Sequence, residues 1–201
     1  MLKSIWKEHT AVGASIFVCV LVGLCAGAFT VNNLSVGQTA SLFDYMSGFS
    51  EIYENQSVSG GNLFVLAAGE NLKSFLFLFL AGMTIVGLPA IYLLCGAKGF
   101  LCGFSVGVFL KAFGTKGIWI SLLTLVPTDM LKLTAFMFLS VHALVFSISM
   151  LKLLSKKDLS VNFQKSIFTF LKATLIALLL LFAGILYESF AAPAVLRVLM
   201  G

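Results

Sequence analysis

Residues 98–117 read Lys-Gly-Phe-Leu-Cys-Gly-Phe-Ser-Val-Gly-Val-Phe-Leu-Lys-Ala-Phe-Gly-Thr-Lys-Gly, and this stretch decides the fold. Within it Gly99, Gly103 and Gly107 recur at every fourth position. Residues four apart lie on the same face of an α-helix, so these glycines form a stripe without side chains. In lipid such a stripe lets the backbone of a second helix come close, and dispersion contacts then hold the pair together. The spacing therefore predicts a tightly packed pair of transmembrane helices.

Composition places most of the chain in a membrane. Of its 201 residues 60% are hydrophobic and 10% are charged, and the mean hydropathy is +1.06. Globular domains carry about 25% charged residues, and a soluble fold could not bury this much apolar surface. The sequence therefore predicts an all-α, polytopic transmembrane helix bundle that forms a single integral membrane domain over residues 1–201. Its net charge of +5 comes from lysines beside apolar stretches, which favours contacts with membrane lipids and not with nucleic acid.

The apolar stretches are long enough for about five crossings of the hydrocarbon. Four of them read as separate crossings, over residues 11–31, 73–96, 133–151 and 166–187. The fifth, residues 99–131, is interrupted and has two interpretations. It either crosses once as a broken helix or forms a re-entrant hairpin of two half-helices. In both cases the bundle must surround the broken backbone, because lipid cannot hydrogen-bond to it.

Prolines, glycines and a lysine refine this layout. Pro89, in Gly87-Leu88-Pro89, predicts a helix break within the second crossing, and Pro127 predicts another in the interrupted segment. Lys98 then marks the inner end of the second crossing. Gly23 and Gly27 form a second pair of packing glycines, in the first crossing.

The lysines also predict how the chain is oriented. Residues 1–10 resemble a short interfacial helix on the cytoplasmic face, and residues 152–165 form a positively charged cytoplasmic loop. Residues 32–72 contain neither Lys nor Arg, which is typical of an extracytoplasmic loop. We therefore expect a cell-membrane protein with a cytoplasmic N-terminus and an extracytoplasmic C-terminus, with Glu188 outside.

An amphipathic helix is predicted within the extracytoplasmic loop. Leu42, Met46, Phe49 and Tyr53 recur at helical spacing, and acidic residues lie mostly between them. The apolar face either lies on the protein's own membrane or bundle, which the pattern favours, or docks an extracytoplasmic partner.

Few polar side chains fall within the apolar stretches, and Asp129, Lys132 and His142 are the main ones. Asp129 and Lys132 are three residues apart, so on a helix they can form an ion pair. The alternative is an ion or proton pathway, but a relay needs a second acid at membrane depth, and none is predicted. The charge pair is therefore favoured, and His142 is expected to be a hydrogen-bonded residue of the bundle.

The sequence does not favour an enzyme. It shows no nucleophile with a base and an orienting acid, and no spacing typical of metal ligands. The four cysteines, separated by five and six residues within their pairs, match no zinc or redox motif. We therefore expect no catalytic residues, no metal and no cofactor.

One family resemblance rests on a set of short motifs. The chain resembles the stage II sporulation protein M family over about residues 11–151. The matching motifs are Gly87-Leu88-Pro89, Lys98-Gly99-Phe100, Gly103-Phe104, Gly107, Gly114-Thr115-Lys116-Gly117 and Val126-Pro127. After this proline family members commonly carry other polar residues, where this chain has Thr128, Asp129, Lys132 and Thr134.

The resemblance implies a non-enzymatic membrane scaffold. In spore formers the family holds cell-wall hydrolases, a lytic transglycosylase and an amidase/endopeptidase, at the septal membrane during engulfment. A scaffold needs packing surfaces and no catalytic groups, which agrees with the residues. The alternative is a transporter or permease subunit that uses the broken segment 99–131. The sequence leaves the oligomeric state open, a homo-oligomer included.

Overall fold

The computed structural model describes residues 2–35, 37–38, 60–84, 87–154 and 163–191, and these are helical apart from short turns. The helices are α1 (Leu2–Asn32), α3 (Gly60–Met83), α4 (Gly87–Ile120), α5 (Val126–Leu154) and α6 (Phe163–Leu186). There are also two π-helical segments. The first, η1 (Ser121–Leu125), leads directly into α5, and the second, η2 (Tyr187–Ala191), follows α6. The predicted all-α class is confirmed, and the described part of the chain contains no strand.

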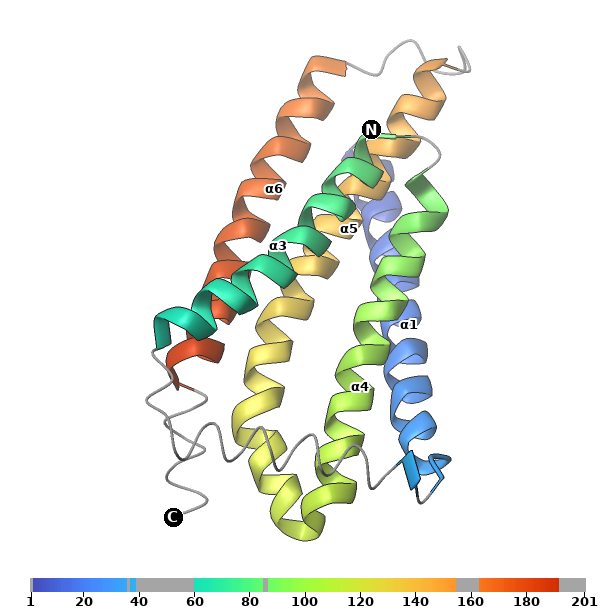
Figure 1. The fold of residues 1–201 in the computed structure, drawn as a ribbon. Coiled ribbons are helices and arrows are strands. Elements are labelled where there is room, and N and C mark those ends of the chain that lie inside the picture. Colours follow the sequence, from blue (N-terminus) through green and yellow to red (C-terminus); the bar gives the residue numbers. More distant parts are fainter. Residues whose placement is uncertain (1, 36, 39–59, 85–86, 155–162, 192–201) are drawn as a thin grey trace.

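Five helical segments are long and apolar enough to cross a membrane, which confirms the predicted number within the described residues. They cover Thr10–Asn32, Phe64–Met83, Gly87–Lys111, Ser121–Leu154 and Phe163–Ala191. Figure 1 shows α1, α4 and α5 running along the long axis of the bundle, with α3 crossing in front. The starts of α1 and α6, the α3–α4 turn and the end of α5 share one end of the molecule.

The prediction of a single crossing over residues 73–96 is wrong, because the chain reverses direction within these residues. The backbone N–H of Thr84 donates to Ala81 O and that of Gly87 donates to Thr84 O, which closes a turn between α3 and α4. A β-carbon at Gly87 would collide with the Ala81 backbone, so only glycine fits there. Pro89 lies in the first turn of α4, where its missing N–H costs nothing, and it begins a helix instead of breaking one.

The interrupted segment 99–131 is neither one broken crossing nor a re-entrant hairpin. Gly114 has φ 55° and ψ −131°, a conformation that glycine adopts without strain, and the chain turns there. One candidate span ends at Lys111 and the next begins at Ser121, so the break lies between two candidate spans and not within one. Figure 1 shows α4 and α5 joined by this turn at the lower end of the bundle.

The segments outside the crossings also differ from their predicted bounds. Residues 2–10 are the first part of the continuous helix α1 and not a separate interfacial helix. Residues 60–72, predicted to belong to the extracytoplasmic loop, are the first half of α3. The predicted cytoplasmic loop is shortened at both ends, since α5 runs to Leu154 and α6 starts at Phe163.

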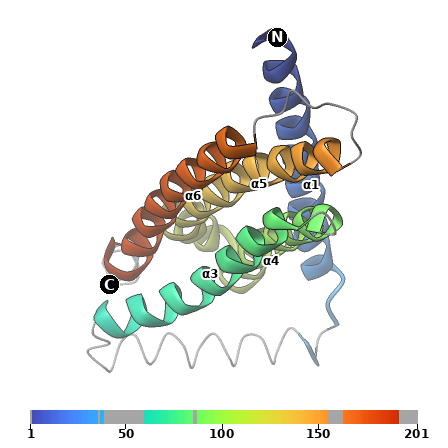
Figure 2. The same cartoon turned by 90° about the horizontal axis from the view of Figure 1, so that it is seen from above.

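Helix α5 lies at the centre of the bundle. It packs against α1, α3, α4 and α6. In its most apolar stretch 44% of the residues are buried, the largest share among the five candidate spans. Figure 2 shows α5 and α6 as one layer, α3 and α4 as a second layer, and α1 along one side. At the end where α3 turns into α4, Phe170 is stacked between Phe79 and Phe146, with ring centroids 5.3 and 5.1 Å away.

Candidate functional site

The predicted packing glycines meet at the interface between α1 and α4. A β-carbon built at Gly99 or Gly103 would lie within 3.0 Å of the backbone of Val20 or Leu24, both on α1. The two helices therefore touch through their backbones, and a methyl group at either position would force them apart. Gly107 is less tightly enclosed, because its nearest neighbour would be the Val31 side chain at 3.1 Å.

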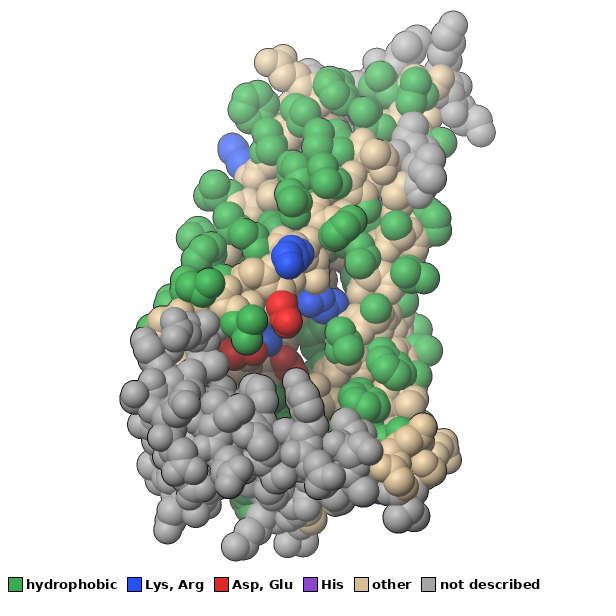
Figure 3. All heavy atoms as spheres, in the orientation of Figure 1, with side chains coloured by type: hydrophobic (Ala, Val, Ile, Leu, Met, Phe, Trp, Pro, Cys, Tyr) green, Lys and Arg blue, Asp and Glu red, His purple; other side chains and the backbone are tan. Residues whose placement is uncertain are grey.

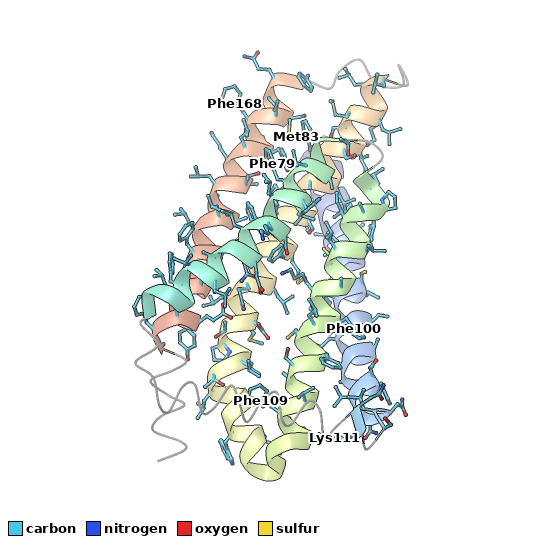
Figure 4. All side chains as sticks on the ribbon, in the orientation of Figure 1. Phe79, Met83, Phe100, Phe109, Lys111 and Phe168 are labelled. Carbon is cyan, nitrogen blue, oxygen red and sulfur yellow. The ribbon has the colours of Figure 1, made fainter. Side chains whose placement is uncertain are left out.

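The glycines of α1 repeat this arrangement from the other side. β-Carbons at Gly23 and Gly27 would lie within 3.0 Å of the backbone oxygens of Gly96 and Phe100. The two glycine stripes thus interlock, each seated against the backbone of the other helix. At one end of this contact the Lys111 ammonium donates a hydrogen bond to Val31 O at 3.0 Å, which satisfies a carbonyl in the last turn of α1. Figure 4 shows Lys111 at the lower end of α4, beside α1.

A second feature is a network of charged side chains within the spans. Lys132 Nζ lies 3.4 Å from Asp129 Oδ1 and 3.2 Å from Glu188 Oε2. The side chains of Lys132 and Asp129 are 14% and 19% exposed, so this part of the network is largely enclosed by protein. The lysine therefore bridges two carboxylates, one on its own helix and one in η2, the segment that follows α6.

Lys98 extends the network to α4. Its ammonium lies 4.8 Å from the centroid of the Phe136 ring, a cation–π contact. Its charge is repelled by Lys132 and attracted by Glu70, Asp129 and Glu188. The prediction that Lys98 marks the inner end of a crossing is wrong. The α4 span runs from Gly87 to Lys111, which puts Lys98 near its middle.

Two acidic members of this network were missed by sequence reasoning. Glu70 was assigned to the extracytoplasmic loop and Glu188 to the outside, but both lie within candidate spans, Phe64–Met83 and Phe163–Ala191. The expectation of no second acid at membrane depth is therefore wrong. Residues Phe64–Met83 are apolar on average even though they include Glu70 and Lys73. This 20-residue stretch is the sequence signal that would have placed Glu70 in a crossing. Figure 3 shows charged side chains gathered among hydrophobic ones on the face that carries α3 and α4.

The π-helical segments lie beside the charged network and contact each other. Pro127 follows η1 at the second position of α5, and the helix continues through it. Because proline has no N–H, it cannot donate to the carbonyl of Leu123 four residues earlier. The Tyr187 hydroxyl, at the start of η2, donates to that oxygen instead, at 3.1 Å. Pro127 thus marks a change of helix type and not an interruption of the helix.

The remaining predicted polar residues are bound locally. A His142 ring nitrogen lies 2.9 Å from Phe138 O one turn earlier. The hydroxyls of Thr128 and Thr134 donate to backbone oxygens of their own helix at 2.8 and 2.7 Å. Within the described ranges no group of three or more His, Cys, Asp or Glu could hold a metal ion. The predicted docking residues Leu42, Met46, Phe49 and Tyr53 lie outside the described residues.

Comparison with known proteins gives one result. The family model described as Stage II sporulation protein M matches residues 16–193, which is most of the chain. The matched region takes in the interlocked glycine stripes, the α3–α4 turn and all five charged residues of the network. Searches of curated proteins and of solved structures each find no match. On the breadth of the family match, the chain belongs to the Stage II sporulation protein M family.

Proposed function

We propose that this protein is a non-enzymatic membrane scaffold that positions extracytoplasmic cell-wall hydrolases. The observation that carries the proposal is the family match over residues 16–193, since the resemblance implies this role. The interlocked α1–α4 pair supports it, because a scaffold needs a rigid frame and backbone contact makes this pair stiff. The proposed docking element is the amphipathic face of Leu42, Met46, Phe49 and Tyr53.

Co-purification tests the scaffold. The tagged protein is extracted from its native membrane in mild detergent, and bound proteins are identified by mass spectrometry. A peptidoglycan hydrolase should be recovered with the wild type and lost with Phe49→Glu and Tyr53→Glu. Ser47→Glu is the matched control, because the helical spacing puts it near the polar face with the same added charge. Recovery of hydrolase with all three variants would exclude this face, and no hydrolase with the wild type would refute the scaffold.

A second candidate function is that of a transporter or permease subunit. Its original basis, a broken helix at membrane depth, is lost because the break at Gly114 lies between two spans. The charged network now favours it instead, since ionisable side chains within spans often line ion and proton pathways. Proton flux into liposomes that contain the purified protein tests it. Flux that disappears with Asp129→Asn would support this function, and the absence of flux from the wild type would rule out proton transport.

A further inference from the structure

Helix α3 has a poor fit between its composition and its surroundings. Of the five candidate spans in the described residues, Phe64–Met83 has the lowest hydropathy, 1.5, and the smallest buried share, 11%. A bundle in lipid is expected to enclose its least apolar helix, because polar groups that face hydrocarbon are costly. Here the least apolar helix is the least covered one. Within the part of the chain that the structure describes, the outer face of α3 is therefore left uncovered.

Lys73 lies in the middle of that outer face. It is exposed, and its helical neighbours Leu66, Leu76, Phe77 and Leu80 are 51–68% exposed. The span of 20 residues is about 30 Å long, which puts Lys73 about 14 Å from one end. A charge at this depth costs about 2.5–3.5 kcal/mol on insertion scales, so it needs a counter-charge.

The same face carries an acid and an open notch. Glu70, one turn before Lys73, is exposed and faces Lys98 at the edge of the charged network. Gly69 lies between the leucines of this face, and a β-carbon there would meet nothing within 4 Å. An acid, a base and a small residue on one helical face provide for both ion pairing and close approach.

We infer that the α3 face, defined as Leu66, Gly69, Glu70, Lys73, Leu76 and Phe77, contacts the same face of a second copy of this chain. A two-fold axis along the membrane normal brings two parallel α3 helices together, with Lys73 of each copy opposite Glu70 of the other. A patch that carries one acid and one base is complementary to itself, as an isologous interface requires. The apolar side chains then pack around two ion pairs shielded from lipid. This interface is independent of the proposed scaffold role.

Charge reversal tests the pairing. Copies labelled with donor or acceptor dye are reconstituted in liposomes over a range of protein-to-lipid ratios, and energy transfer reports association. Lys73→Glu or Glu70→Lys alone should weaken self-association about threefold to tenfold. Mixing the two variants should restore transfer between them, because both cross-pairs are again opposite in sign. Lys172→Glu, which reverses an exposed lysine on α6, is the matched control and should leave association unchanged.

Cross-linking keeps the inference testable if a charge variant does not fold. In a Cys25→Ser background, which removes the exposed native thiol, Leu76→Cys should form a disulfide-linked dimer in liposomes upon oxidation. Leu179→Cys, at a 65% exposed position of α6, should not. A monomeric wild type, no restoration in the mixed sample, or equal cross-linking at both positions would overturn the inference.

Discussion

The hydroxyl of Tyr187 donates a hydrogen bond to the backbone oxygen of Leu123, 3.1 Å away and 64 residues earlier in the chain. The two residues belong to π-helical segments, η2 after α6 and η1 before α5. Because Pro127 has no N–H, it cannot supply the α-helical hydrogen bond to this oxygen from four residues on. The Tyr187 hydrogen bond fastens the end of α6 to the start of α5 beside the charged network. π-Helical segments are frequent at functional sites, which makes this junction a place to test.

Tyr187→Phe should lower stability by about 0.5–1.5 kcal/mol, the net worth of one hydrogen bond. Thermal unfolding in detergent measures the change. The informative comparison is the same substitution in a Pro127→Ala background, where the backbone N–H at position 127 can donate to Leu123 O. There Tyr187→Phe should cost clearly less. If the tyrosine is worth the same in both backgrounds, Pro127 does not create the need for it.

Substitutions that add a side chain at the interlocked glycines should force α1 and α4 apart. Gly103→Leu puts atoms where the Leu24 backbone lies, and even Gly103→Ala would put a β-carbon within 3.0 Å of it. We expect loss of the folded bundle for leucine and a cost of about 3 kcal/mol for alanine. Expression level, monodispersity and thermal unfolding report this.

Gly96→Ala is the control on the same helix and the same interface. A β-carbon there would lie 3.5 Å from Cys19 Sγ, an ordinary contact, so this variant should be as stable as the wild type. Equal tolerance of alanine at positions 96 and 103 would show that the two backbones do not approach as closely as described.

Replacing Lys132 alone should destabilise the protein more than replacing Lys132 and Glu188 together. Lys132→Met leaves Asp129 and Glu188 without their common partner, and an uncompensated buried charge costs about 3–5 kcal/mol. The loss should fall below that range, because the Glu188 side chain is 36% exposed. The double variant Lys132→Met/Glu188→Gln should recover part of the stability. A double variant that is less stable than Lys132→Met alone would contradict this account of the network.

The sequence predicts the fold class and the glycine contacts better than it predicts the ends of the helices. Glycines four residues apart lie on one face of a helix wherever that helix begins or ends, so Gly99 and Gly103 could be recognised from the sequence alone. The second crossing was misplaced because residues 73–96 are apolar throughout, and hydropathy alone does not reveal a turn of a few residues. What reverses the chain is the close approach of Gly87 to Ala81, a contact that exists only after folding.

The charged network was hidden for the same reason. Once the start of the second crossing was placed at residue 73 and not at Phe64, Glu70 fell into a loop and Lys98 fell at a boundary. Glu188 is 59 residues from Asp129 in sequence, and only the packing of α6 on α5 brings both to Lys132. The i, i+3 pair of Asp129 and Lys132 is local and could be predicted. The three members from α3, α4 and η2 depend on tertiary structure.

The phenylalanine stack of α3, α5 and α6 gives a prediction with a control two residues away. Phe170 is 2% exposed and lies between Phe79 and Phe146, whereas Phe168 is 57% exposed and lies on the outer side of α6 (Figure 4). Phe170→Ala removes a buried ring from the centre of the stack and should cost about 3–5 kcal/mol. Phe168→Ala removes the same atoms from a surface that faces lipid and should change little. Thermal unfolding of both variants in the same lipid measures the difference, and equal losses would mean that the stack does not hold the three helices together.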